Sequence, residues 1–464
     1  MDEDIGSLAA ALRVGSLTSE ALLDRCLERV RRIDPRLNSF VALDEEGARA
    51  AAKASDARLA RGAPRSPLDG VPISVKDNIH VAGLPTTWGS RGLRDYSPGK
   101  DELPVARLRA AGAIVLGKTN VPEFTLEGYT NNDLFGVTRN PWNLALTPGG
   151  SSGGAAAGVA AGLVPAAIGT DGGGSIRRPA GHNGLVGWKP SVGRFPRIDG
   201  LPAILTDFET VGTLTRTIGD VLLLDAVMAG PDARDRRSFA LAAPAWSERP
   251  LRIVFTPQFG AAPVDPEVAD VTERVAQGLE RDGHAVRRES VFFDLKDAAH
   301  IWNVVSRAGV AWLMDVWRGG GLETLAGSSA CAMAGEGRRV TGADYFDTLE
   351  RVAALRRLAI EFFANADLLL TPTAAALPWA AETPYPERID GKLAGPRDHA
   401  IFTGWANIAG VPAISLPVAV SRAGLPIGVQ FAAGFGADAS LLAFAGAFSR
   451  RNPPPPLPVM EQGR

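Results

Sequence analysis

Residues 147–154 read Thr-Pro-Gly-Gly-Ser-Ser-Gly-Gly, and residues 169–177 read Gly-Thr-Asp-Gly-Gly-Gly-Ser-Ile-Arg. An Ala-rich run follows the first segment directly, and a short apolar run precedes the second. Glycines allow backbone N–H groups to turn inward and to approach a bound group closely. Three glycines that lead to Ser175 therefore suit a site that holds an oxyanion beside a nucleophile.

Two other uses of such segments fit the sequence less well. A flexible linker is disfavoured because apolar runs flank both segments closely. A phosphate-binding loop of the P-loop type needs the pattern G-x-x-x-x-G-K-[ST], and neither segment contains the lysine.

Short apolar runs alternate with helix-like patterns along the chain. We expect helices at about 22–33, 48–61, 104–111, 155–163 and 268–281, and strands at about 71–75, 113–116, 166–169, 251–255 and 284–287. Thr18 is a suitable N-cap for the first of these helices. Such alternation predicts an α/β fold around a mainly parallel or mixed sheet.

The second half of the chain is expected to extend the same sheet. Residues 229–250 form a polar connection, and residues 250–370 read as an added α/β subregion rather than a separate domain. Residues 374–400 are rich in proline and charge, which predicts a long surface loop. A Pro-rich tail covers residues 451–464.

The chain has 464 residues, of which 45% are hydrophobic and 22% charged, as is usual for a soluble globular protein. A net charge of −2 offers no basic field for nucleic acid and no polybasic membrane anchor. The most apolar stretch, 155–169, is too short to span a bilayer, and the N-terminus is acidic, unlike a secretory leader. The two cysteines, Cys26 and Cys331, cannot form a disulfide framework, and Cys26 is expected to be buried. We expect a cytoplasmic protein without nucleic-acid or membrane partners.

A serine nucleophile needs a base, and Lys76 is the most informative candidate. None of the five histidines lies in a recognisable motif, and no metal-binding pattern occurs, so no metal is expected. Lys76 ends the apolar run 71–75, where a charged amine is costly unless it is neutralised or paired. Burial can lower its pKa by several units from about 10.4. The alternative is a salt bridge to Asp77 or another carboxylate, and spacing alone leaves both possibilities open.

At these positions the sequence resembles the amidase signature family, serine hydrolases with a Ser–cisSer–Lys triad. The resemblance rests on residues 149–154, on 171–177 with the following Pro-Ala at 179–180, and on Lys76 in Val-Lys-Asp-Asn. Further matching stretches are 117–124, 139–143, 187–194, 407–417 and 424–430. The resemblance runs from about residue 5 to 450, and it implies a single domain over 1–464 with a signature core at about 65–215. It also implies a mixed, largely parallel central β-sheet covered by helices on both faces.

The resemblance implies a catalytic role for three side chains. By the resemblance, Ser175 is the nucleophile and Lys76 is the base. Ser151 is the serine that bridges them, and it follows a cis Gly150–Ser151 peptide bond. Neutral Lys76 then takes a proton from Ser151, which takes one from Ser175. The implied oxyanion hole lies at Gly172, Gly173 and Gly174, and supporting residues are Ser152, Asp171, Arg177 and Thr170. No cofactor is expected.

The sequence is less informative about the substrate. Phe124, Leu126, Tyr129 and Gly150 resemble a pocket lining, whereas the apolar residues of the next α/β region either line a funnel or pack in the core: Trp302, Val305, Trp312, Leu313 and Trp317. These features favour a neutral, apolar or aryl small-molecule amide, with esters and carbamates (urethanes) open to the same chemistry. A monomer or homodimer is expected.

Two alternatives belong to other classes of protein. An amidotransferase A subunit would release ammonia from glutamine for a partner enzyme. Such subunits usually carry Thr where this chain has Gly172, and Gln where it has Arg178, so both positions count against this alternative. A non-catalytic protein on a hydrolase scaffold is disfavoured because all three triad positions are occupied by the expected residues.

Overall fold

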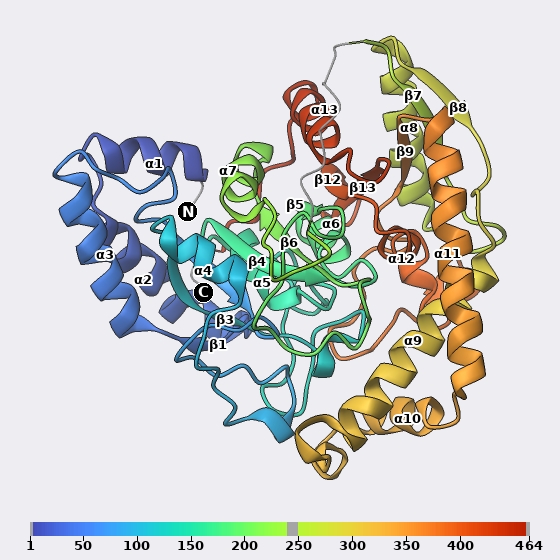
Figure 1. The fold of residues 1–464 in the computed structure, drawn as a ribbon. Helices are drawn as coiled ribbons and strands as arrows, with labels where there is room; N and C mark the ends of the chain where they lie inside the picture. The colour runs from blue at the N-terminus through green and yellow to red at the C-terminus, as the bar shows by residue number, and fades with distance from the viewer. Residues whose placement is uncertain (1–2, 239–248, 461–464) are drawn as a thin grey trace.

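One mixed β-sheet runs through the part of the chain that the computed structural model describes, residues 3–238 and 249–460 (Figure 1). Its eleven strands have the order β1-β3-β2-β4-β6-β5-β12-β13-β9-β7-β8. The strands are β1 (Phe40–Leu43), β2 (Pro72–Lys76), β3 (Ile114–Thr119), β4 (Ala166–Asp171), β5 (Val186–Lys189), β6 (Thr210–Thr215), β7 (Arg252–Phe255), β8 (Ala285–Arg288), β9 (Leu368–Pro372), β12 (Ala413–Val420) and β13 (Pro426–Ala432). A small hairpin, β10 (Arg388–Ile389) with β11 (Lys392–Leu393), stands apart from it.

Parallel pairs occur in two groups of strands. β3, β2 and β4 form one group, and β9, β7 and β8 form the other. The strands between these groups pair antiparallel, because short connections such as that from β12 to β13 reverse the chain. The strands β7, β8 and β9, which lie within or at the end of residues 250–370, thus belong to the same continuous sheet.

Helices cover both faces of the sheet, which confirms the predicted α/β architecture (Figure 1). Successive side chains of a strand point to opposite faces, so Leu368 and Leu370 belong to one apolar cluster and Leu369 to another. The first face packs against α1 (Ile5–Arg13), α4 (Leu103–Ala110), α7 (Ile218–Met228) and α13 (Asp438–Arg451). The other face packs against α2 (Ser19–Leu37), α3 (Glu45–Leu59), α5 (Gly153–Ala160), α6 (Arg177–Asn183), α9 (Leu295–Asp315), α11 (Gly342–Asn365) and α12 (Gly404–Ile408). The remaining helices are α8 (Pro266–Arg281), which contributes to both faces, and α10 (Ser328–Gly337), which packs on α9.

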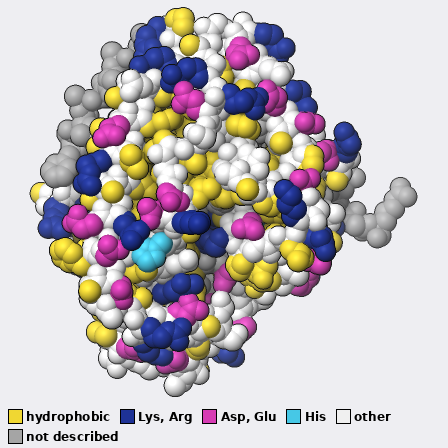
Figure 2. Space-filling view, turned by 90° about the vertical axis from the view of Figure 1, so that its right-hand side faces the viewer, with side chains coloured by type: hydrophobic (Ala, Val, Ile, Leu, Met, Phe, Trp, Pro, Cys, Tyr) yellow, Lys and Arg dark blue, Asp and Glu magenta, His cyan; other side chains and the backbone are white. Residues whose placement is uncertain are grey.

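The N-terminal helix prediction holds in detail. Thr18 Oγ1 accepts a hydrogen bond from the N–H of Ala21 at 3.1 Å and so caps α2. Cys26 is completely buried among the apolar side chains of that helix. None of the helices in the described residues is long and apolar enough to cross a membrane. On the face drawn in Figure 2, basic and acidic side chains are interspersed rather than gathered by sign.

The prediction of a surface loop at 374–400 is only partly right, because the middle of the segment is exposed whereas its two ends are buried. Ala375, Trp379 and His399 are buried, and the carbonyl of Trp379 accepts a hydrogen bond from the N–H of Thr147 at 2.8 Å. Proline and charge dominate the composition of this segment, but several of its apolar side chains, such as Ala375 and Trp379, face the body of the protein. The segment therefore lies against the first glycine-rich region. Of the polar connection at 229–250, residues 239–248 lie outside the described part of the chain.

Replacing Leu370 by alanine tests the central role of the sheet. Leu370 is fully buried in β9, so Leu370→Ala is expected to lower the free energy of unfolding by about 2–5 kcal/mol. The control is Leu393→Ala, because Leu393 is 72% exposed on the small hairpin. Urea unfolding followed by circular dichroism measures both variants, and equal midpoints for the two would contradict the assignment of β9 to the core.

Candidate active site

Lys76 is the last residue of β2, beside the parallel strand β4. The carboxyl ends of these two strands lie at the same edge of the sheet, where α/β proteins place their sites. Lys76 Nζ donates hydrogen bonds to Ser151 Oγ at 2.8 Å, Thr170 Oγ1 at 2.9 Å and the Thr170 carbonyl at 3.2 Å. The amine is completely buried and surrounded by neutral oxygen acceptors.

The salt-bridge alternative for Lys76 is not what the structure shows. Asp77 lies 3.5 Å from Lys118 and also binds the hydroxyl of Thr87. Among the described residues, no carboxylate lies within ion-pair distance of Lys76. Burial lowers the pKa of Lys76 to about 7, although the more distant charges of Glu209 and Asp171 act to raise it. The amine can therefore exist uncharged near neutral pH.

Ser151 and Ser175 are held next to each other through their backbones. The Gly150–Ser151 bond is cis, which confirms the prediction, and Gly150 has no room for a side chain against the backbone of Tyr129. The N–H of Ser152 donates to the carbonyl of Ser175 at 3.1 Å. Ser175 Oγ has no hydrogen-bond partner among the described residues, so the contact from Lys76 to Ser151 is formed here and that from Ser151 to Ser175 is not.

Asp171 fixes the turn of the second glycine-rich segment. Its carboxylate accepts hydrogen bonds from the N–H of Gly174 at 2.6 Å and of Ile176 at 3.1 Å. The N–H of Gly174 is thus engaged within the loop, which differs from its expected role in an oxyanion hole. The N–H groups of Gly172, Gly173 and Ser175 donate to no acceptor in the part of the chain that the structure describes.

Arg177 joins this turn to the C-terminal strands. Its guanidinium binds Asp171 through two nitrogens, at 2.8 and 2.9 Å, and both side chains are fully buried. The same guanidinium donates to Gln430 Oε1 at 2.7 Å and Asn407 Oδ1 at 2.6 Å. Burial alone would raise the pKa of Asp171, but Arg177 beside it holds that pKa well below its usual range.

Arg178 bridges the two glycine-rich segments, a role that the sequence did not indicate. Its Nη1 donates to the carbonyl of Gly173 at 2.9 Å, and its Nη2 donates to the carbonyl of Gly150 at 3.2 Å. Burial and the nearby charge of Arg397 lower its pKa to about 9. Arg178 therefore remains positively charged at neutral pH and ties the loop of Ser175 to that of Ser151.

The residues that were expected to line a substrate pocket do not lie together: one packs in the core and two line a small cavity. Phe124 is fully buried in an edge-to-face ring contact with Trp88, so it packs in the core. Leu126 and Tyr129 line a cavity of about 160 Å³ against the N-terminal end of α10. The residues at 302–317 that were expected either to line a funnel or to pack in the core are also divided. Val305 and Leu313 are core residues, Trp312 is 44% exposed, and Trp317 stacks edge-on against Tyr96.

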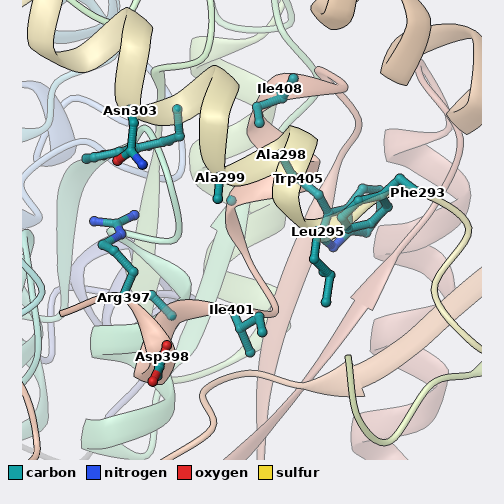
Figure 3. A pocket seen from close by; sticks show the side chains of 13 residues that line it. Phe293, Leu295, Ala298, Ala299, Asn303, Arg397, Asp398, Ile401, Trp405 and Ile408 are labelled. Carbon is teal, nitrogen blue, oxygen red and sulfur yellow. The ribbon is translucent and has the colours of Figure 1, made fainter. Parts of the chain in front are cut away.

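Trp302 of α9 faces the glycine loop. It lines a cavity of about 240 Å³ together with Arg397, Asn303 and apolar side chains that include Phe293 and Trp405 (Figure 3). Sequence reasoning missed Arg397, because it lies in the segment expected to be a surface loop. No group of three or more His, Cys, Asp or Glu side chains within 3–238 and 249–460 could hold a metal ion.

Comparisons with known proteins agree with this geometry. The model of the Amidase family matches residues 21–442. The A subunit of glutamyl-tRNA(Gln) amidotransferase from Halorhodospira halophila is 36% identical, over 94% of this chain and 95% of that protein. A bacterial aryl acylamidase of the amidase signature family superposes with a TM-score of 0.90, at 28% identity, over 97% of this chain and 96% of the other. For the corresponding A subunit from Thermotoga maritima the TM-score is 0.79, at 28% identity, over 96% and 95% of the two chains.

Removing the charge of Asp171 tests the buried ion pair. Asp171→Asn would leave the fully buried Arg177 without its counter-charge, so we expect a loss of about 3–5 kcal/mol in the free energy of unfolding. Asp232→Asn is the matched control, since its partner Arg234 is 59% exposed and solvent screens the pair. Thermal unfolding of both variants gives the comparison. A transition temperature of Asp171→Asn equal to that of the control would refute the structural role of the pair.

Proposed function

The chain belongs to the amidase family, and on that premise we propose that it hydrolyses the C–N bond of a carboxylic amide through an acyl-enzyme on Ser175. The buried amine of Lys76 carries this proposal. It has no carboxylate partner within ion-pair distance among the described residues, and it donates to Ser151 at 2.8 Å. An amine with a pKa of about 7 can accept a proton at neutral pH and return it within one catalytic cycle.

Acylation uses the three side chains in order. Uncharged Lys76 takes the hydroxyl proton of Ser151 as Ser151 takes that of Ser175, and Ser175 Oγ forms a bond to the amide carbon. Rotation of the Ser175 side chain completes the relay, because the backbone bond from Ser152 to Ser175 already holds the two loops together. Ser151 then protonates the leaving nitrogen as the C–N bond breaks, and Lys76 returns a proton to Ser151.

Negative charge that develops on the carbonyl oxygen needs donors whose position is fixed in advance. The N–H groups of Gly172, Gly173 and Ser175 are the candidates, because that of Gly174 is bound to Asp171. One such donor contributes about 3–4 kcal/mol to transition-state stability. Asp171, Arg177 and Arg178 act on these donors indirectly by holding the loop. Water hydrolyses the acyl-enzyme through the same relay, so esters and carbamates are chemically possible substrates.

The cavity lined by Trp302 and Arg397 favours a substrate with an apolar or aryl portion. Its lining includes Phe293, Leu295, Ile401 and Trp405, which offer hydrocarbon surface to a ligand. The close superposition on an aryl acylamidase supports the same class of substrate.

An amidotransferase A subunit is the second candidate, because relatives of that kind are 32% and 36% identical. Gly172 and Arg178 depart from the residues usual in such subunits, and Arg178 has its own structural role here. Ammonia release from glutamine distinguishes the two functions. A glutaminase that is silent alone and rises on addition of amidotransferase partner subunits would replace the main proposal, whereas hydrolysis of anilides by the chain alone would support it.

Alanine at the two ends of the relay should remove activity. Ser175→Ala is expected to abolish amide hydrolysis, and Lys76→Ala to lower kcat by at least about 10³-fold, as loss of one member of a catalytic unit does. Lys53→Ala is the control, because Lys53 is exposed on α3. Labelling of the wild type by a sulfonyl fluoride, absent in Ser175→Ala, would confirm the nucleophile. No labelling of the wild type would favour a non-catalytic scaffold, and a Lys76→Ala variant that kept most activity near pH 7 would refute the relay.

The pH dependence follows from the state of Lys76. Only the uncharged amine accepts a proton, and the fraction of uncharged amine grows about tenfold per pH unit below its pKa of about 7. We expect kcat/KM for an anilide to rise with unit slope up to about pH 7 and to level off above it. A profile that is flat between pH 5.5 and 9 in a buffer series of constant ionic strength would contradict the assignment.

A further inference from the structure

Arg397 and Trp302 place two hydrogen-bond donors on one face of the glycine loop. The guanidinium of Arg397 stacks over the indole of Trp302 at 3.9 Å from the ring centroid. A side chain on Gly173 would begin 3.0 Å from Trp302 Nε1 and 3.2 Å from Arg397 Nη2. Both donors therefore adjoin Gly173, two residues before Ser175, and both residues also line the cavity of about 240 Å³.

Neither donor has an acceptor among the described residues. Trp302 Nε1 is buried without a hydrogen-bond partner, and the side chain of Arg397 forms no ion pair or hydrogen bond within 3–238 and 249–460. Glu127 exerts only an electrostatic influence on Arg397 from a greater distance. The neighbouring Asp398 accepts a hydrogen bond from Gly395, and its carboxylate points away from the guanidinium (Figure 3). Burial lowers the pKa of Arg397 only to about 10, so the cation persists at neutral pH.

The buried N–H group of Trp302 is costly to leave without an acceptor, whereas the Arg397 side chain is partly exposed to solvent and open to a ligand. The shape of the site indicates which acceptor fits. Stacking on Trp302 fixes the plane of the guanidinium and leaves its N–H edge free, and that edge matches the two oxygens of a carboxylate. Most of the remaining lining is apolar, including Phe293, Ile401 and Trp405, and it gives a hydrocarbon group a place beside the charge; Asn303 and Asp398 are the other polar members of the lining (Figure 3).

We propose that Arg397, with Trp302, binds a carboxylate carried by the amide substrate, so that this chain selects acidic rather than neutral amides. The inference rests on the proposed amide hydrolysis and revises the expectation of a neutral substrate. Arg397 then determines specificity and takes no part in proton transfer, since neither Lys76 nor Ser151 binds it.

The test compares matched anilides with and without a carboxylate. One pair carries the charge on the acyl chain (4-carboxybutananilide and pentananilide), and the other carries it on the ring (4-acetamidobenzoate and 4-methylacetanilide). Wild type, Arg397→Gln and Arg397→Lys are assayed with both pairs. Arg318→Gln is the matched control, because Arg318 also stacks on aromatic rings, at Tyr96 and Trp317, but is exposed. Sulfonyl fluoride labelling of Ser175 verifies that each variant retains its active site.

For at least one pair, the wild type should prefer the acidic anilide by at least tenfold in kcat/KM. Arg397→Gln should remove this preference for the acidic anilide, mainly through KM, whereas Arg397→Lys should retain part of it. The inference would be overturned if, for both pairs, the ratio of kcat/KM for the acidic and the neutral anilide were the same in wild type, Arg318→Gln and Arg397→Gln. That result would leave the proposed amide hydrolysis intact. Failure of the wild type to hydrolyse any anilide or to label at Ser175 would instead refute the proposed function.

Discussion

The proposed active site depends on one amine that is buried with no counter-ion among the described residues. Lys76 contacts two hydroxyls and a carbonyl, and the carboxylate next to it in sequence, Asp77, is taken by Lys118. Lowering the pKa of a lysine from 10.5 to about 7 costs on the order of 5 kcal/mol. The fold must supply this free energy, and in return Lys76 can be uncharged near neutral pH beside Ser151, as the proposed relay requires.

On the neighbouring strand β4, a buried charge is neutralised by an ion pair instead of by loss of its proton. Asp171 and Arg177 are equally buried, but they neutralise each other and satisfy their remaining hydrogen bonds with Asn407 and Gln430. This fully paired network holds the glycine turn in place. The site thus contains two kinds of buried charge. The ion pair of Asp171 and Arg177 holds the glycine loop in place, whereas Lys76 has no carboxylate partner among the described residues and can exchange a proton.

Much of this site could be predicted because its key signals are local. A lysine at the end of an apolar strand and two glycine-rich segments appear as short patterns, and the cis bond before Ser151 follows from the resemblance of that segment to its family. Contacts between distant segments leave no such pattern. The bonds from Arg177 to Gln430 and from Arg178 to Gly150 depend on the folded sheet, and Arg397 lay in a segment whose composition suggested a surface loop. The engagement of the Gly174 N–H by Asp171 is likewise a matter of loop geometry.

The most direct test of the uncharged amine is a lysine titration by NMR. Protein labelled with ¹³C at the lysine side chains shows seven lysines, and a Lys76→Met variant identifies the signal of Lys76 by its loss. Comparison is needed because burial also lowers the pKa of Lys189 to about 7. We expect the Cε signal of Lys76 to shift with a midpoint near pH 7. A Lys76 signal that keeps the chemical shift of a protonated amine up to pH 10 would contradict the assignment of Lys76 as an uncharged base.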